Sequence, residues 1–232
     1  MMLTGHIITK ITPSIKGKYA CDIADALSRI LPLYGMADPD IFHEFWANVL
    51  EESWEMGRMT ENLNYKVESL IEKFGRHRIS IADAKRYGRI DGKQKANQPA
   101  IANCIYGGKW AKLNLGNFAP THGWDLRGSG PMQLTGFWMI AGFRDYYAKR
   151  FGHTYTVEQM AHLLRTDLEI GLHSACWVFA IAKKLIPAAI SKNLTSTQVV
   201  ERMKYIVEKI NGGHTNLRKR LAYYEDVKMN VM

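Results

Sequence analysis

Hydrophobic residues recur along most of this chain at steps of three and four, the spacing of one buried face of an α-helix. The clearest helix is expected to begin at Asp38, a residue that can cap a helix, followed by Pro39, which fits the first helical position. Six apolar residues then follow the helical steps: Phe42, Phe45, Trp46, Val49, Leu50 and Met56. The pattern therefore predicts a helix with one face turned into a core.

The polar residues of this helix divide into two groups by the same count. One group forms a stripe that is predicted to face water, namely Glu44, Asn48, Glu51 and Glu55. Glu52 instead falls seven and three positions after Phe45 and Val49, beside the apolar face. Burial disfavours the charged form of a carboxyl group, so Glu52 is a candidate proton donor. A position at the helix flank, with the carboxyl group reaching water, is the alternative.

A second candidate acid, Glu61, lies nine positions beyond Glu52. A continuous helix would separate the two by about 13.5 Å, but Gly57 favours an end to the helix. We therefore expect Glu61 to return across a cleft. Two carboxyl groups roughly 6.5–9.5 Å apart leave room for a water molecule, which is the arrangement of an inverting glycosidase. An ordinary capping or loop role for Glu61 is the alternative.

The rest of the chain also favours helices, because no alternating pattern lasts long enough for a main β-sheet. Residues 1–16 are expected to form an irregular arm. Further helices are predicted at 19–30, 67–74, 99–105, 157–165, 167–186, 196–210 and 215–228. The fold class is therefore all-α, and residues 1–232 are expected to form a single domain.

Residues 107–136 interrupt the helical pattern with seven glycines and with Trp110 and Trp124. Long irregular segments in compact domains are usually functional, glycines let backbone approach a ligand, and tryptophan rings offer flat apolar faces to sugars. We expect an irregular substrate loop here, with room for one small hairpin near 124–135. A surface loop that its tryptophans pin to the core is the alternative.

Composition and charge narrow the class of protein. The chain has 232 residues, 47% of them hydrophobic, and no run approaches the length of a membrane span. Its start lacks the features of a signal peptide, so we expect synthesis in the cytoplasm without an export signal. The net charge of +9 favours an anionic partner, but the basic residues are scattered and no nucleic-acid motif is present.

Metal and thiol chemistry find little support in the sequence. His43-Glu44 is not followed by a histidine four positions after His43, so the helical zinc motif is absent. No other histidine pair has an evident ligand spacing, and no metal or other cofactor is expected. Cys21, Cys104 and Cys176 lie among apolar neighbours and are expected to be buried free thiols.

Five segments carry a recognisable pattern in a fixed order. They are Glu51-Glu52-Ser53, Glu61-Asn62-Leu63-Asn64-Tyr65, Ile101-Ala102-Asn103 with Tyr106-Gly107-Gly108, the stretch GWDLRGSGPMQLTG at 123–136, and Asn211-Gly212-Gly213 with Arg220 and Tyr224. Together they resemble the endolysin branch of glycoside hydrolase family 19, which has a chitinase-like fold of the lysozyme superfamily. The resemblance covers roughly residues 20–228, and its second and fourth segments are specific.

The resemblance implies catalytic roles for three residues. Glu52 matches the general acid that protonates the glycosidic oxygen, Glu61 the base that activates water, and Thr135 the hydroxyl that helps to hold this water. The candidate substrate-binding residues are Tyr65, Trp124, Arg127, Gln133, Asn211 and Arg220. The two acids suit a transition state that needs one protonated and one ionised carboxyl group. The hydroxyl of Thr135 could equally satisfy a local backbone group.

The chain departs from the family pattern at four positions. Glu51 stands where the family usually has histidine, and Ser129 replaces the second arginine of the central signature. Met139 and Ile140 replace an Asn-Tyr pair, and methionine cannot make the hydrogen bonds of asparagine. These departures bear on substrate preference.

The implied protein is a phage-type endolysin that cleaves the β-1,4 glycan backbone of bacterial peptidoglycan, as an inverting muramidase. Residues 1–232 would form its single catalytic domain, with no separate cell-wall-binding module. We expect a monomer that the basic surface could hold to anionic envelope polymers. Neither nucleic acid nor stable membrane insertion is expected. The enzyme would reach the periplasm or cell wall through a holin pore, or be delivered from a virion.

Three alternatives stay open. A lytic transglycosylase fits the Glu52-Ser53 pair and the turn at 130–133, and it needs only one catalytic acid. A chitinase would share the mechanism and differ in substrate. A non-enzymatic glycan-binding or virion structural protein is favoured by Met139 and Ile140.

Overall fold

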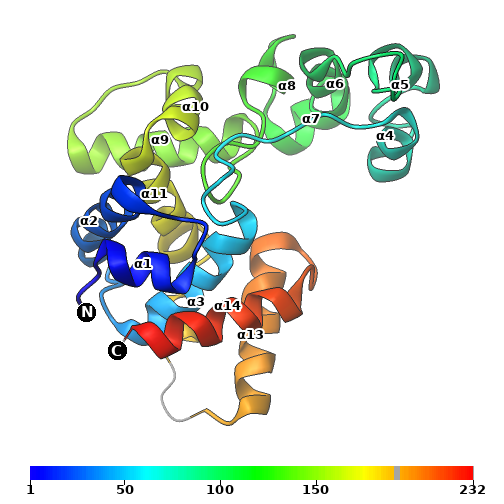
Figure 1. The fold of residues 1–232 in the computed structure, drawn as a ribbon. Coiled ribbons are helices and arrows are strands. Elements are labelled where there is room, and N and C mark those ends of the chain that lie inside the picture. The colour runs from blue at the N-terminus through cyan, green and yellow to red at the C-terminus, as the bar shows by residue number, and fades with distance from the viewer. Residues whose placement is uncertain (191–193, 232) are drawn as a thin grey trace. The chain divides into compact units, whose positions relative to one another are not determined.

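The computed structural model describes residues 1–190 and 194–231, and it is built almost entirely of helices (Figure 1). The helices are α1 Gly5–Ile11, α2 Gly17–Leu33, α3 Pro39–Glu52, α4 Val67–Phe74, α5 Ile81–Tyr87, α6 Gln98–Ile105, α7 Gly108–Leu115, α8 His122–Asp125, α9 Phe137–Phe151, α10 Val157–Thr166, α11 Leu168–Trp177, the π-helix η1 Val178–Ala182, α12 Ile186–Ala189, α13 Ser196–Asn211 and α14 Leu217–Asn230. Within the described residues, β-structure is limited to isolated bridges. The predicted all-α class is confirmed.

The chain folds into two compact units. Unit 1 consists of residues 1–59, 130–132 and 167–232, and unit 2 of residues 60–129 and 133–166. The single catalytic domain expected from the sequence stays a prediction. No helix in the described part of the chain is long and apolar enough to cross a membrane.

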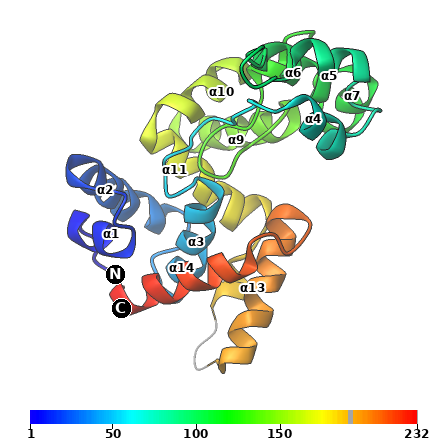
Figure 2. The same ribbon diagram turned by 45° about the vertical axis from the view of Figure 1, so that its right-hand side comes forward.

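Unit 1 is organised around α3. The Asp38 side chain accepts a hydrogen bond from the backbone N–H of Asp40 at 2.8 Å, and Pro39 occupies the first turn. The predicted apolar face is confirmed from Phe42 to Leu50, where each of its side chains is 0% exposed; Met56 is buried as well, at 2%, but lies in the turn beyond α3. α14 runs alongside α3 in both ribbon views (Figures 1 and 2), and α1 packs on α2.

The polar stripe of α3 does not face water, and this prediction was wrong. Glu44 and Asn48 are 0% exposed and Glu51 is 6% exposed, because α14 lies along this side of the helix. Glu44 pairs with Arg202 at 2.7 Å, Asn48 accepts from Arg220 at 2.8 Å, Glu51 accepts from Asn216 at 2.6 Å, and Glu55 accepts from Tyr223 at 2.7 Å. Helical periodicity identifies a polar side, but it does not say whether water or another helix satisfies it.

Unit 2 has its own apolar core under α4, α5 and α6. The buried side chains are Leu63, Leu70, Phe74, Ile79, Ala84, Ile101, Ala102 and Ile105. Tyr65, Tyr106 and Trp124 are partly buried against this cluster. Trp124 is therefore tied to the core, as the pinned-loop alternative expected.

Several boundaries differ from the predictions. The expected irregular arm at 1–16 contains α1, in which Thr4 caps the backbone N–H of Ile7 and two isoleucines are buried. The expected irregular loop at 107–136 contains α7 and α8, and Gly116 ends α7 in a left-handed conformation rather than preventing the helix. α9 was not predicted, because its apolar residues do not gather on one side. The hairpin near 124–135 is reduced to a single bridge between Ser129 and Leu134.

The cysteines match the prediction only in part. All three are free, but Cys21 is exposed, Cys104 is partly exposed and only Cys176 is buried. Cys21 lies in α2 opposite α1, where a Cβ atom on Gly5 would come within 2.5 Å of its sulfur. An apolar neighbourhood in sequence therefore did not guarantee burial in the fold.

Candidate active site

The predicted site residues fall into two groups, one in each compact unit. Unit 1 contains Glu52, Asn211 and Arg220. Unit 2 contains Glu61, Tyr65, Trp124, Arg127, Gln133 and Thr135. The separation of the two carboxyl groups stays a prediction.

Glu52 is the last residue of α3, and its carboxyl group meets polar donors rather than the apolar wall that the helix count suggested. Asn211, at the end of α13, donates from Nδ2 to Glu52 Oε1 at 2.9 Å. Arg220 of α14 pairs with the same oxygen through Nη2. The side chain of Glu52 is 18% exposed, so solvent and a substrate can still reach it.

Arg220 fixes this group in place. Its guanidinium is almost completely buried and also donates to Asn48 Oδ1 at 2.8 Å and to the carbonyl oxygen of Thr215 at 3.2 Å. A buried guanidinium is tolerated only when its donors find partners, and here three groups share them. Arg220 therefore connects the last turns of α3 to the start of α14.

Glu61 is held from both sides in unit 2. The hydroxyl of Tyr106 donates to Oε1 at 2.8 Å, and the backbone N–H of Gly128 donates to Oε2 at 3.1 Å. The backbone N–H of Glu61 in turn donates to the carbonyl oxygen of Gly128 at 2.9 Å. A Cβ atom at position 128 would lie 2.7 Å from Gln133 Oε1 and 3.2 Å from Glu61 Oε2, so a larger residue there would displace these side chains.

Tyr106 and Arg127 set the electrostatics around Glu61. Burial, followed by the charge of Glu61, raises the pKa of Tyr106 far above its ordinary value, so its hydroxyl stays a donor. Burial lowers the pKa of Arg127, while the charges of Glu61 and Asp125 act in the opposite direction. The guanidinium of Arg127 lies 3.5 Å from the ring centroid of Trp124 and donates to its carbonyl oxygen at 2.6 Å. The site thus combines a fixed carboxylate with a fixed cation.

Thr135 and Gln133 follow in the same loop. Thr135 Oγ1 donates to the carbonyl oxygen of Gln133 at 2.9 Å, which is the local backbone bond that the sequence left open. The lone pairs of this hydroxyl can still accept a hydrogen bond from water. Gln133 has a left-handed backbone with φ of 51°, which is uncommon for a residue with a side chain. The water-holding role of Thr135 stays a prediction.

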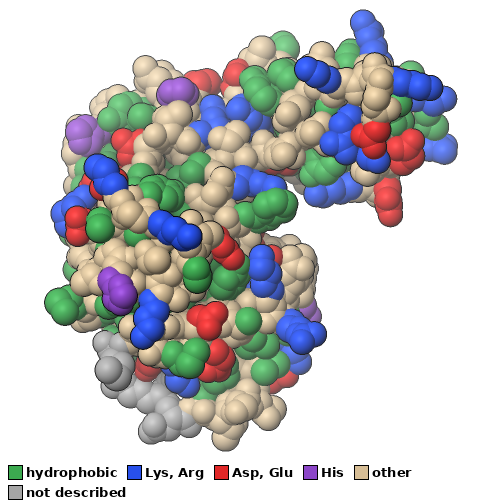
Figure 3. Space-filling view, in the orientation of Figure 1, with side chains coloured by type: hydrophobic (Ala, Val, Ile, Leu, Met, Phe, Trp, Pro, Cys, Tyr) green, Lys and Arg blue, Asp and Glu red, His purple; other side chains and the backbone are tan. Residues whose placement is uncertain are grey.

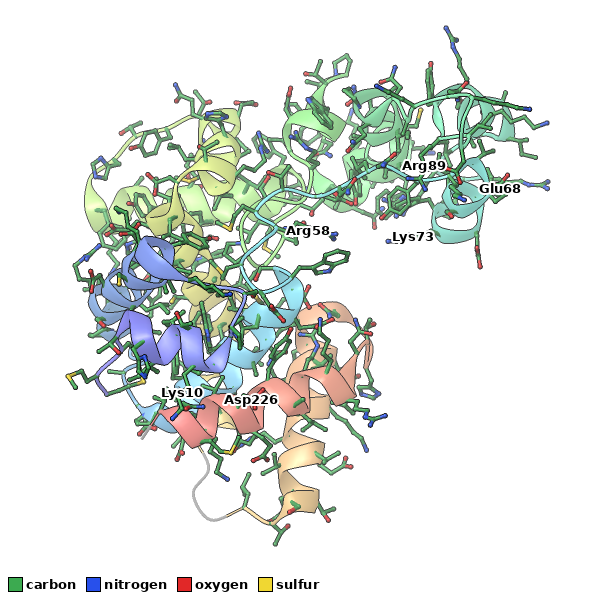
Figure 4. All side chains as sticks on the ribbon, viewed as in Figure 1. Lys10, Arg58, Glu68, Lys73, Arg89 and Asp226 are labelled. Carbon is green, nitrogen blue, oxygen red and sulfur yellow. The ribbon has the colours of Figure 1, made fainter. Side chains whose placement is uncertain are left out.

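Tyr65 and Trp124 are anchored before any ligand binds. Tyr65 accepts a hydrogen bond from Lys73 at 2.8 Å, and its ring meets the Phe74 ring edge-on at 5.5 Å; Lys73 is labelled in Figure 4. The backbone N–H of Trp124 donates to Asn103 Oδ1 at 2.8 Å. Both aromatic side chains therefore have defined positions within unit 2.

The candidates named from the sequence left out Tyr106, Asn103 and Arg165. The first two stand inside segments that resemble the family, so the signal was present. Arg165 of α10 gave no such signal, yet it donates to Ser129 Oγ at 2.8 Å and to the Asp125 carbonyl oxygen at 3.0 Å. Burial, with repulsion from Arg127, lowers its pKa to about 10. A guanidinium therefore lies beside position 129, where the family signature has an arginine.

Metal chemistry has no visible site in the part of the chain that the structure describes. No group of three or more His, Cys, Asp or Glu side chains gathers there in a way that could hold an ion. The two candidate carboxyl groups are instead bound by guanidinium, amide, phenol and backbone donors.

One known protein is similar in sequence to this chain along almost its whole length. It is a Haemophilus influenzae protein described as a glycosyl hydrolase family 19 domain-containing protein. The two sequences are 27% identical over 225 residues, which is 97% of this chain and 94% of that protein. This similarity supports the resemblance to family 19. No family model matches the chain.

Proposed function

We propose that this chain is a glycoside hydrolase that cleaves the β-1,4 glycan backbone of bacterial peptidoglycan as a muramidase. The observation that carries the proposal is that Glu52 and Glu61 are each held by specific donors, in segments that resemble the family. The full-length similarity to a family 19 protein supports glycosidase chemistry in general. The substrate and the endolysin role are our own inference.

In the proposed inverting mechanism Glu52 protonates the leaving glycosidic oxygen while Glu61 removes a proton from the attacking water. Once Glu52 has given up its proton, Arg220 and Asn211 stabilise the carboxylate that remains. Tyr106 and the backbone of Gly128 keep the oxygens of Glu61 aimed in fixed directions. Thr135 would accept a hydrogen bond from the water.

The net positive charge of the chain supports a second part of the proposal, which is binding to anionic polymers of the bacterial envelope. The chain carries +9, and its Lys and Arg side chains are spread over the visible face instead of forming one patch (Figure 3). A diffuse positive surface favours a polyanionic layer such as an anionic envelope polymer, and salt weakens the attraction. We propose a monomer that is made in the host cytoplasm and reaches the wall through a holin pore or from a virion.

The decisive experiment is digestion of purified peptidoglycan followed by mass spectrometry of the fragments. A muramidase releases reducing-end muramic acid, a glucosaminidase releases reducing-end glucosamine, and a transglycosylase leaves an anhydro end. Glu52→Gln and Glu61→Gln should each lower the rate by roughly 10² or more, since each removes one proton transfer. Glu225→Gln, at an exposed position of α14, serves as the matched control and should be fully active.

The other outcomes identify the alternatives. A transglycosylase would keep its activity in Glu61→Gln and lose it in Glu52→Gln. A chitinase would prefer chitin oligomers to peptidoglycan. The non-enzymatic alternative predicts wall binding with no release of reducing ends. Ile140 was one of the residues that favoured the non-enzymatic alternative. Its side chain is 0% exposed, so it packs in the core and is not available to a ligand.

A further inference from the structure

The turn that follows Glu52 is strained. Trp54, Glu55 and Met56 have φ values of 50°, 57° and 61°, so three consecutive residues with side chains adopt the left-handed conformation. This conformation is unfavourable for L-residues other than glycine, and it persists only where the surroundings enforce it. Gly57 stands next to the turn but is not among the residues with positive φ.

Almost every other group of this turn is fixed. Ser53 Oγ donates to the carbonyl oxygen of Val49 at 2.6 Å and accepts from the backbone N–H of Met56 at 2.8 Å. The Met56 side chain is 2% exposed, and its carbonyl oxygen accepts from the Tyr19 hydroxyl at 3.1 Å. Glu55 accepts from Tyr223 at 2.7 Å and also from Ser14. The fold therefore enforces the turn on both sides of position 54.

Trp54 differs from its neighbours because its side chain is 63% exposed. The guanidinium of Arg58 lies 3.6 Å from the centroid of its ring; Arg58 is labelled in Figure 4 on the segment after α3. Arg58 is itself held at its backbone N–H, which donates to the Ser53 carbonyl oxygen at 2.8 Å. The turn thus presents a large flat ring to solvent, backed by a cation, two residues beyond the candidate acid.

We propose that Trp54 is a sugar-stacking platform, on which one pyranose ring of the glycan rests beside Glu52. The turn buries Met56 in the core but leaves the indole of Trp54 in solvent, where it would position a sugar ring next to the reacting bond. The C–H-rich face of a pyranose complements the electron-rich face of an indole. The cation–π contact with Arg58 holds the indole of Trp54 in place. This proposal rests on the glycan substrate proposed above.

The occupant is therefore an uncharged sugar ring of a β-1,4 glycan, with the Arg58 guanidinium already stacked on the indole. Stacking acts on binding and leaves the proton transfers to Glu52 and Glu61. Loss of the ring should accordingly raise KM and the dissociation constant while kcat changes little.

The test measures binding of soluble peptidoglycan glycan fragments by calorimetry in the inactive Glu61→Gln protein, with and without Trp54→Gly. Glycine accepts the left-handed backbone, so Trp54→Gly should keep its melting temperature within about 2 °C of the parent or raise it. Binding should weaken roughly tenfold, and Trp54→Phe should restore most of it. KM of Trp54→Gly in the active protein should rise by a similar factor.

Tyr205→Ala is the matched control, because Tyr205 is another exposed aromatic residue of unit 1, 48% exposed with Lys209 5.4 Å from its ring centroid. It should leave both KM and binding unchanged. If Trp54→Gly binds as tightly as the parent while wild-type protein cleaves peptidoglycan, stacking is refuted and the hydrolase stands. If wild-type protein binds the fragments without cleaving them and Trp54→Gly loses this binding, the platform stands and the hydrolase fails. If wild-type protein binds no glycan, both are overturned.

Discussion

Glu44 provides the sharpest test of the electrostatics in unit 1. It lies in the middle of α3 with 0% exposure, paired with Arg202 at 2.7 Å. Burial raises the pKa of Glu44 from 4.5 to about 7, and Arg202 offsets only part of that effect. We predict that replacing Glu44 by glutamine, which does not titrate, removes a pH dependence of stability that the wild type shows.

The sign follows from which state holds the proton. Between pH 4.5 and about 7 the folded protein keeps a proton on Glu44 and the unfolded chain does not. The contribution to folding free energy is therefore fully present below pH 4.5 and is lost as the pH rises through 7. Linkage gives a loss of about 2.5 kcal/mol between pH 5 and pH 8, which corresponds to about 5 °C in melting temperature for a chain of this length.

Urea denaturation of wild type and Glu44→Gln at pH 5 and pH 8 measures this difference. Histidines titrate in the same range, but they are common to both proteins and largely cancel. Glu225→Gln, exposed on α14, should shift stability equally at both pH values. A wild-type-minus-variant difference that changes by less than about 0.5 kcal/mol would mean that Arg202 keeps Glu44 ionised throughout, and the burial argument would be wrong.

Three further predictions concern the candidate site. Tyr106→Phe should lower kcat roughly tenfold on peptidoglycan with KM unchanged, because the Glu61 carboxyl group loses one of its two hydrogen-bond donors, and an unchanged kcat would show that Tyr106 plays no part in the reaction. Arg220→Met should lower the free energy of unfolding by about 3–5 kcal/mol, since Asn48 and Glu52 lose a buried partner. Chemical denaturation measures this loss, and a clearly smaller value would contradict the prediction. Raising NaCl from 50 to 500 mM should raise KM on intact cell walls with little effect on short oligosaccharides, and equal effects on both would exclude a polyanion-binding surface.

The sequence was most informative where a single helix decides the outcome. The steps from Phe42 to Leu50 predicted the buried face of α3, and Asp38 with Pro39 predicted its start. The prediction from periodicity was wrong on the opposite side of the same helix, where the acidic side chains were expected to face water. Apart from Ser14 beside Glu55, the partners of those acids lie in α13, in α14 or at its N-cap, more than 150 positions away, and no local pattern reports them.

The surroundings of Glu61 show the same limit. The donors to its carboxyl group, the Tyr106 hydroxyl and the Gly128 backbone N–H, lie 45 and 67 positions further along the chain, so spacing alone could not assemble them. Resemblance to a family was more effective here, because it flagged the segments that contain Tyr106 and Gly128 without knowledge of their contacts. It could not flag Arg165, whose guanidinium reaches Ser129 from α10.

An end to the helix near Gly57 was predicted, and α3 ends at Glu52, but the conformation of the turn between them was not anticipated. Glycine normally signals a left-handed backbone, yet here three residues with side chains adopt it and the adjacent Gly57 does not. Arg220 and Trp54 therefore contribute in different ways beside the same acid. Arg220 connects Glu52 to the core of unit 1, so its replacement should lower stability and activity together. Trp54 supports no core contact that the fold needs, so its replacement should separate binding from stability.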